Sequence, residues 1–164
     1  MCIRDRYVAG LSLFKSRRSP IKLSANESAL GPSPKAVKSY SLVGKGFVRY
    51  PDSDGTYFRK VLAKKFKLKR DRIILGSGSD QIFELVCKLF LNKGDEVVVP
   101  EYSFIIYRIY SRMFGAKVKY AKENNFAVSV DSIMDCVSKK TKIVFLANPN
   151  NPTGTYLNKY EVLK

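Results

Sequence analysis

The alternation of strand and helix patterns along the chain constrains its fold more than any other feature. Short runs rich in β-branched and aromatic residues alternate with longer segments whose apolar residues recur at helical spacing. Strands are expected at residues 72–75, 96–99, 117–120 and 142–147, and helices at 34–43, 56–66, 80–90, 104–114, 132–137 and from about 158. This alternation predicts an α/β fold in which helices flank a mostly parallel sheet.

Composition excludes several classes of protein. A chain of 164 residues with 45% hydrophobic residues is large enough to bury a core. It has no apolar run of the roughly eighteen residues that a membrane span needs and no secretory signal peptide. Its three cysteines, Cys2, Cys87 and Cys136, are widely spaced and odd in number. This pattern favours reduced thiols in the cytoplasm over disulfides or a zinc site, so we expect neither a metal nor a membrane partner.

Histidine is absent from the chain. Catalytic triads of serine, histidine and aspartate, cysteine–histidine pairs and HExxH zinc sites all require an imidazole, so these sites are excluded. Chemistry based on this chain would then rely on lysine, tyrosine, carboxylates or an organic cofactor. The absence of histidine therefore favours a cofactor.

The net charge of +16 supports a different class, a basic module that binds nucleic acid. The positive residues are dispersed, however, and the densest group, at positions 60–70, follows the polar side of the expected helix 56–66. Such a group is typical of a solvated helix face, and the excess charge also suits attraction of a small phosphorylated substrate. We therefore expect no nucleic-acid partner. The alternative predicts an affinity for nucleic acid that falls steeply with salt.

A glycine-rich turn, Leu75-Gly-Ser-Gly-Ser-Asp80, separates an expected strand from an expected helix. In this position, free backbone N–H groups and the helix dipole can hold a phosphate. A dinucleotide fingerprint would need a glycine where Gln81 stands, and no P-loop motif exists. A small phosphate group remains as the ligand, and a capped helix without a ligand is the alternative.

Two other expected strands end in residues that suit ligand binding. Tyr102 follows strand 96–99, where its ring can stack on a flat ligand. The turn 148–154, with three asparagines, two prolines and a glycine, follows strand 142–147 and offers amide donors. The alternatives are an aromatic ring packed under a loop and a rigid loop with no ligand. Together the three strand ends offer a phosphate cradle, an aromatic face and an amide donor, which suit a planar phosphorylated pyridine.

The run Asn151-Pro-Thr-Gly154 resembles the signature of the aminotransferases that depend on pyridoxal 5'-phosphate (PLP) and have the aspartate aminotransferase fold. Residues 7–164 as a whole resemble the histidinol-phosphate aminotransferases within that family. The motifs that carry this resemblance are Lys22-Leu-Ser-Ala-Asn-Glu27, Gly31-Pro-Ser-Pro34, Arg49-Tyr-Pro-Asp52, Gly76-Ser-Gly-Ser-Asp80, Asn92-Lys-Gly-Asp95 and Asn148-Pro-Asn-Asn-Pro-Thr-Gly154. Ser28-Ala29 departs from the family's usual Asn-Pro, which leaves the finer substrate contacts open.

The resemblance implies PLP as cofactor and a role for each matching residue. The backbone amides of Ser79 and Asp80 would bind the PLP phosphate, the Tyr102 ring would stack on the pyridine, and the Asn151 amide would bind the phenolic oxygen. Three other residues have implied roles: Tyr50 at the cofactor phosphate of the partner subunit in a homodimer, and Asn26 and Tyr7 at the substrate.

The resemblance also implies a domain organisation and a reaction. Residues 7–30 would form an N-terminal arm and 31–164 an incomplete PLP-binding large domain, while residues 1–6 carry no pattern and are interpreted as a foreign scar. The implied reaction is transamination of imidazole acetol phosphate with glutamate to give histidinol phosphate. Aromatic aminotransferases and threonine-phosphate decarboxylases are alternatives of the same family, and a non-catalytic relative is a third alternative.

The resemblance places the lysine that binds PLP covalently beyond residue 164, so no catalytic residue is assigned in this chain. PLP chemistry needs that lysine both as an anchor and as a base. We therefore predict that the purified 164-residue chain has no measurable transaminase turnover. An assay of imidazole acetol phosphate conversion checks this, and detectable product would contradict it.

Overall fold

The computed structural model describes residues 25–163, which fall into two compact units. Residues 25–75 belong to one unit and residues 76–163 to the other. Tyr7, the predicted scar 1–6 and most of the predicted arm 7–30 lie outside the described residues. The division into scar, arm and large domain therefore stays a prediction.

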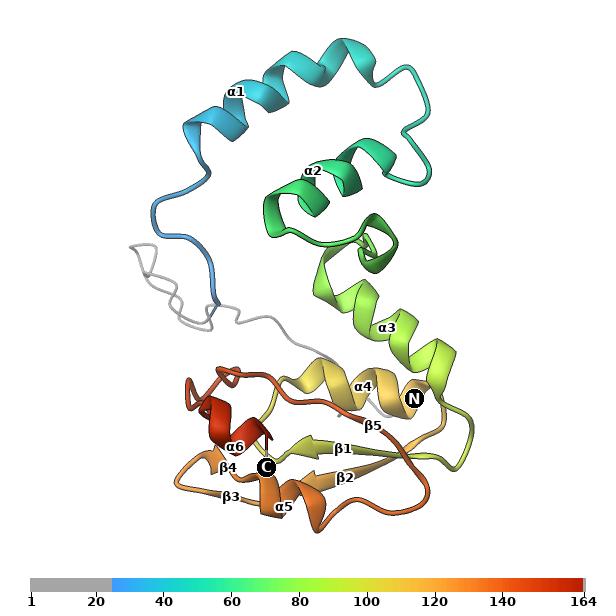
Figure 1. The fold of residues 1–164 in the computed structure, drawn as a ribbon, viewed down its shortest axis with the longest axis vertical. Helices are drawn as coiled ribbons and strands as arrows, with labels where there is room; N and C mark the ends of the chain where they lie inside the picture. Colours follow the sequence, from blue (N-terminus) through green and yellow to red (C-terminus); the bar gives the residue numbers. More distant parts are fainter. Residues whose placement is uncertain (1–24, 164) are drawn as a thin grey trace, which may run out of the picture. The chain divides into compact units, whose positions relative to one another are not determined.

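The unit of residues 25–75 is helical. It contains α1 (Pro34–Val43), the 3₁₀ turn η2 (Gly44–Gly46), α2 (Thr56–Phe66) and the 3₁₀ turn η3 (Arg70–Arg72), coloured blue to green in Figure 1. Both α-helices have the predicted bounds. Pro34 begins α1, a position at which the backbone N–H makes no bond within the helix, so the N–H that proline lacks is not needed. In the first turn of α2, the Tyr57 N–H donates a hydrogen bond to the Asp52 carboxylate (3.4 Å). None of residues 25–44 and 46–75 is buried.

The prediction of a strand at residues 72–75 is wrong. Arg72 ends η3, and Ile73 is extended (φ −120°, ψ 120°), but the described residues provide no strand beside it. A β-strand exists only through hydrogen bonds to a neighbour. The local pattern therefore predicts an extended backbone correctly and cannot predict whether a partner strand is present.

The unit of residues 76–163 contains a parallel three-stranded sheet. Strand β1 (Glu96–Pro100) lies between β2 (Lys117–Ala121) and β5 (Thr141–Val144), and both pairings are parallel. The other elements of this unit are α3 (Gly78–Phe90), α4 (Ile105–Met113), a short antiparallel hairpin of β3 (Glu123–Asn124) and β4 (Ala127–Val128), α5 (Val130–Met134) and α6 (Lys159–Leu163). The predicted α/β fold with a mostly parallel sheet is therefore confirmed.

Several predicted bounds differ from the structure for local reasons. α5 begins at Val130, two residues before the predicted start, because Ser129 and Ser132 form a reciprocal capping box. β5 ends at Val144 instead of residue 147. The hairpin β3–β4 was not predicted, since strands of two residues carry no detectable alternation.

Strand β1 is buried on both faces. Val97 and Val99 pack with residues of α3 and α4 on one side, and Val98 packs with Ile133 of α5 on the other. Figure 1 shows α4 and α5 on opposite sides of the sheet. The continuous Val97–Val99 run is therefore the expected pattern of a central strand in a sheet covered on both faces.

The side chain of Cys87 in α3 is fully buried, and its ionisation makes the stability of the fold depend on pH in the alkaline range. Burial raises its pKa, and a hydrogen bond with Ser111 offsets part of that rise. Above about pH 8.5, the ordinary pKa of a thiol, the unfolded chain ionises while the buried thiol stays protonated, so stability falls as pH rises. This fall is at most about 1.4 kcal/mol per pH unit.

We predict that Cys87→Ala flattens the alkaline fall in stability of the full-length protein that contains this chain. Urea unfolding at pH 7.5 and 9.5 measures the difference. Val97→Ala, which removes a buried side chain without a titrating group, is the control and should lose equal stability at both pH values. An unchanged slope in Cys87→Ala would contradict the prediction.

Candidate functional site

Three segments meet at the carboxyl edge of the sheet: the turn after β1, the β3–β4 hairpin and the loop after β5. The Asn150 amide nitrogen donates to the Tyr102 carbonyl oxygen (3.3 Å), which joins the first segment to the third. The Thr155 hydroxyl donates to the Phe126 carbonyl oxygen (2.8 Å), which joins the third to the second. Parallel strands bring their carboxyl ends together at one edge, which is the usual ligand side of such sheets.

The N-terminus of α3 offers the predicted backbone donors. Ser79 and Asp80 are the second and third helical residues, so their N–H groups have no carbonyl one turn earlier in the helix to bond. Gly78 has a left-handed φ of +73°, and the Ser77 N–H donates to the Gln81 side-chain oxygen (2.6 Å). The turn therefore fits the prediction of a site for a small phosphate.

Aromatic contacts hold the first half of α3 near the strand ends. The Phe83 ring packs edge-on against Tyr107 of α4 (4.9 Å between centroids) and against Phe145, directly after β5 (5.9 Å). Tyr107 and Phe145 stack on each other at 4.8 Å. Phe83, more than one turn after the start of α3 at Gly78, thus ties this helix to α4 and to the residue that follows β5.

Tyr102 lies in the turn after β1 and is 46% exposed. Its ring meets Phe126 of the hairpin with centroids 5.3 Å apart and planes at 61°. The Tyr102 ring is therefore packed against a loop on one side, and it still exposes surface on which a flat ligand could stack. The structure thus agrees with both interpretations of this residue, a ring packed at a loop and a ring available for stacking.

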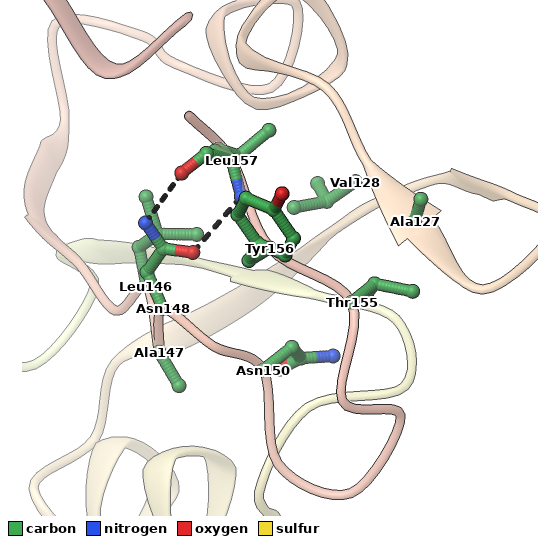
Figure 2. Close-up of a pocket in the computed structure, with 9 residues that line it drawn as sticks. All are labelled: Ala127, Val128, Leu146, Ala147, Asn148, Asn150, Thr155, Tyr156 and Leu157. Atoms are coloured by element: carbon green, nitrogen blue, oxygen red, sulfur yellow. Dashed lines mark hydrogen bonds between the residues drawn. The ribbon is translucent and has the colours of Figure 1, made fainter. Parts of the chain in front are cut away.

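The asparagines of the turn after β5 have different surroundings. The Asn148 side chain pairs with the Leu157 backbone in both directions, donating to its carbonyl oxygen (2.8 Å) and accepting from its N–H (2.9 Å), as Figure 2 shows. Asn150 is buried and donates to Tyr102 and Thr153. Asn151 is half-buried, and its amide makes no hydrogen bond with any residue among 25–163. The side-chain oxygen of Asn150 is buried without a partner, so of the three asparagines only Asn151 has both amide atoms uncommitted among the described residues and is not itself buried.

The hollow drawn in Figure 2 lies between this turn and the hairpin. It encloses about 10 Å³ of free space, which corresponds to about one water molecule. A hollow of that size belongs to the packing of the loop and is too small for a cofactor.

We predict that Asn148→Ala lowers the free energy of unfolding of the full-length protein by about 1–3 kcal/mol, because two backbone groups of Leu157 lose their partners. Chemical denaturation measures this. Asn92→Ala, at an exposed position before β1, is the matched control and should change stability by less than about 0.5 kcal/mol. Equal effects of the two substitutions would show that the Asn148 pairing adds no stability.

The remaining predicted site residues lie elsewhere. Tyr50 and Asn26 are exposed and belong to the unit of residues 25–75, and Tyr7 lies outside the described residues. Their roles stay predictions. Sequence reasoning assigned no role to Glu123 or Asn150, which contact the Tyr102 backbone; Asn150 lies within the motif 148–154, whereas no motif signalled Glu123.

Three groups of the unit of residues 76–163 fit PLP by their chemistry. Helix N-terminal amides suit a phosphate dianion, an exposed aromatic ring suits the pyridine, and the uncommitted amide of Asn151 suits a phenolic oxygen. Within residues 25–163 no three side chains of histidine, cysteine, aspartate or glutamate gather as a metal site would require. No helix in the same range is long and apolar enough to cross a membrane.

Comparison with known proteins points to one family. The family described as aminotransferase class I and II matches residues 18–164. Histidinol-phosphate aminotransferase of Pelagibacter ubique (strain HTCC1062) is 50% identical over 159 residues, which cover 97% of this chain and 44% of that protein. Histidinol-phosphate aminotransferase 1 of Caulobacter vibrioides is 40% identical and is covered to the same extent, with 95% of this chain aligned. The chain thus spans less than half the length of these relatives.

Solved structures agree with this match at the level of the fold. A histidinol-phosphate aminotransferase from Sinorhizobium meliloti in complex with pyridoxal-5'-phosphate superposes with a TM-score of 0.80 at 21% identity, covering 85% of this chain and 38% of the other. A structure described as a putative histidinol-phosphate aminotransferase, from Erwinia carotovora atroseptica, has a TM-score of 0.77 at 26% identity, covering 84% and 40%.

Proposed function

Since the chain belongs to the aminotransferase class I and II family, we propose that it is the N-terminal part of a PLP-dependent histidinol-phosphate aminotransferase. The proposed reaction transfers the amino group of glutamate to imidazole acetol phosphate and yields histidinol phosphate. The observation that carries the proposal is that the exposed Tyr102 and the uncommitted amide of Asn151 lie in two loops joined by the Asn150–Tyr102 hydrogen bond at one edge of a parallel sheet, in the same unit as the N-terminus of α3.

Each of these groups has a proposed part in holding the cofactor. The backbone amides of Ser79 and Asp80 bind the phosphate, helped by the positive end of the α3 dipole. Tyr102 packs its ring against the pyridine and excludes water from one face. The Asn151 amide donates to the phenolic oxygen and orients the ring in its plane.

When bound, PLP supplies an electron sink that stabilises negative charge at the substrate α-carbon. The described residues contribute binding and orientation to this chemistry. Asn151 favours the ionised phenolic oxygen because a donated hydrogen bond stabilises the charged form. No residue of this chain is assigned a part in the proton transfer.

The substrate, the partner and the location are parts of the same proposal. The names of the two curated relatives support histidinol phosphate and its keto precursor, and the net charge of +16 suits attraction of phosphorylated molecules. We propose a homodimer in which Tyr50, whose side chain is fully exposed, reaches the partner's cofactor phosphate, and in which Asn26 and Tyr7 approach the substrate. The free thiols of Cys87 and Cys136 support a reducing, cytoplasmic location.

An assay of the full-length protein tests the proposed function. The purified protein, loaded with PLP, is expected to convert imidazole acetol phosphate and glutamate into histidinol phosphate and 2-oxoglutarate. Aromatic keto acids and threonine phosphate serve as competing substrates. Faster turnover of an aromatic keto acid, or release of carbon dioxide from threonine phosphate, would replace the proposed substrate by one of the alternatives.

A further inference from the structure

The backbone of Tyr102 is held from two directions by side chains of other segments. The Tyr102 N–H donates to the Glu123 carboxylate (3.1 Å), and its carbonyl oxygen accepts from the Asn150 amide (3.3 Å). Glu123 lies 21 residues later in the chain and Asn150 lies 48 residues later. Both bonds come from segments far along the chain instead of from within the turn, so they tie the Tyr102 backbone to the hairpin and to the loop after β5.

The Tyr102 ring is held by the same two segments. Its neighbour Phe126 has a left-handed φ of +61°, a conformation that costs energy for a bulky residue. The Thr155 hydroxyl holds the Phe126 carbonyl, and Thr155 in turn pairs with Thr153 (2.8 Å), which accepts from Asn150 (2.9 Å). These contacts close a ring of interactions that begins and ends at Tyr102.

Glu123 is the charged residue among these contacts. The surroundings of its carboxylate do not suggest that it stabilises the fold. One carboxylate oxygen bonds Tyr102, while the other is buried and has no hydrogen-bond partner among the described residues. The residue as a whole is only partly buried, but an oxygen that is buried without a hydrogen-bond partner is costly, and it stands on a strand of only two residues. What it provides is a charge-assisted hydrogen bond, the kind that constrains geometry most strongly.

We propose that Glu123 is a positioning residue that fixes the backbone of Tyr102 and thereby sets the plane of its ring for stacking on the PLP pyridine. This inference rests on the proposed function, since it takes Tyr102 as the residue that stacks on the cofactor. If the Tyr102 ring is already held in place before PLP arrives, PLP binding does not cost the conformational entropy of ordering that side chain.

The experiment uses the full-length apoprotein and PLP. Cofactor affinity is measured by fluorescence titration, ring orientation by the visible circular dichroism of bound PLP, and the melting temperature of the apoprotein reports on folding. Glu123→Ala is expected to weaken PLP binding about tenfold and to change the circular dichroism band. Glu123→Gln keeps an acceptor oxygen for Tyr102 but loses the charge, so its affinity is expected to lie between those of wild type and Glu123→Ala, within about threefold of wild type. Glu101→Ala, an exposed neighbour in the same turn, is the matched control and should bind PLP like wild type.

A double-mutant cycle with Tyr102→Ala separates a positioning role from a structural one. If Glu123 acts through the tyrosine ring, then Glu123→Ala should weaken PLP binding by less than about twofold once Tyr102 is already alanine. A tenfold loss that persists in the Tyr102→Ala background would overturn the proposal, as would wild-type affinity and dichroism in Glu123→Ala.

The outcomes also separate this inference from the proposed function. If the wild-type protein fails to bind PLP, the proposed function falls and the inference falls with it. If wild type binds PLP and Tyr102→Ala weakens binding, but Glu123→Ala does not, the positioning role alone is wrong. If Tyr102→Ala binds PLP like wild type, stacking by Tyr102 is wrong and Glu123 has nothing to position.

Discussion

Asn151→Ala is expected to weaken PLP binding by the full-length protein about 10- to 100-fold, the worth of one hydrogen bond to a charged oxygen. The amide of Asn151 makes no bond within the described part of the chain, so its loss leaves no protein group unpaired. The melting temperature of the apoprotein should therefore stay close to wild type while cofactor affinity falls. Titration of the apoprotein with PLP, followed by absorbance, measures the affinity.

Two other asparagine substitutions serve as controls for Asn151→Ala. Asn92→Ala, in the exposed turn before β1 and at the opposite edge of the sheet, should change neither affinity nor melting temperature. Asn148→Ala should lower the melting temperature, because its amide is bonded to the Leu157 backbone. If Asn151→Ala destabilises the apoprotein as much as Asn148→Ala does, then Asn151 has a structural role instead of a role in cofactor binding.

Val98→Asp is expected to lower the free energy of unfolding of the full-length protein by more than about 4 kcal/mol. Val98 is 0% exposed at the centre of the sheet and packs with Ala121, Val128, Ile133 and Leu157, none of which can pair with a carboxylate side chain. Soluble yield and urea unfolding of the purified protein measure the loss.

Smaller and matched changes test the mechanism behind the Val98 prediction. Val98→Thr keeps the volume and buries a hydroxyl, so it should cost about 1–3 kcal/mol, clearly less than aspartate. Lys139→Asp introduces a carboxylate in the exposed turn before β5 and should change stability by less than about 0.5 kcal/mol. A loss below 1 kcal/mol for Val98→Asp would mean that this face of β1 is open to water in solution.

The elements that could be predicted are those with strong local signals. α1 and α2 have their predicted bounds because a proline at the first helical position and an apolar stripe act within a single helix. The strand expected at residues 96–99 exists, and its continuous run Val97–Val99 is explained by burial on both faces. The strand expected at residues 72–75 failed because its pairing depends on a neighbour that no local pattern specifies.

By itself, the sequence determined the alternation of helices and strands, the parallel sheet and two of the three strand ends at which site residues were expected, because these follow from periodicity and turn chemistry over short distances. The third strand end, after residues 72–75, is absent because no described strand pairs there. Only the tertiary structure decided which polar groups those strand ends leave available. Asn148 and Asn151 are the same residue type three positions apart, yet one amide is bonded to the Leu157 backbone and the other is not bonded to any described residue. Likewise, Glu123 meets Tyr102 only because the β3–β4 hairpin folds back beside β1. Hydrogen bonds between segments far apart in the chain depend on the packing of the whole sheet edge, which no single segment encodes.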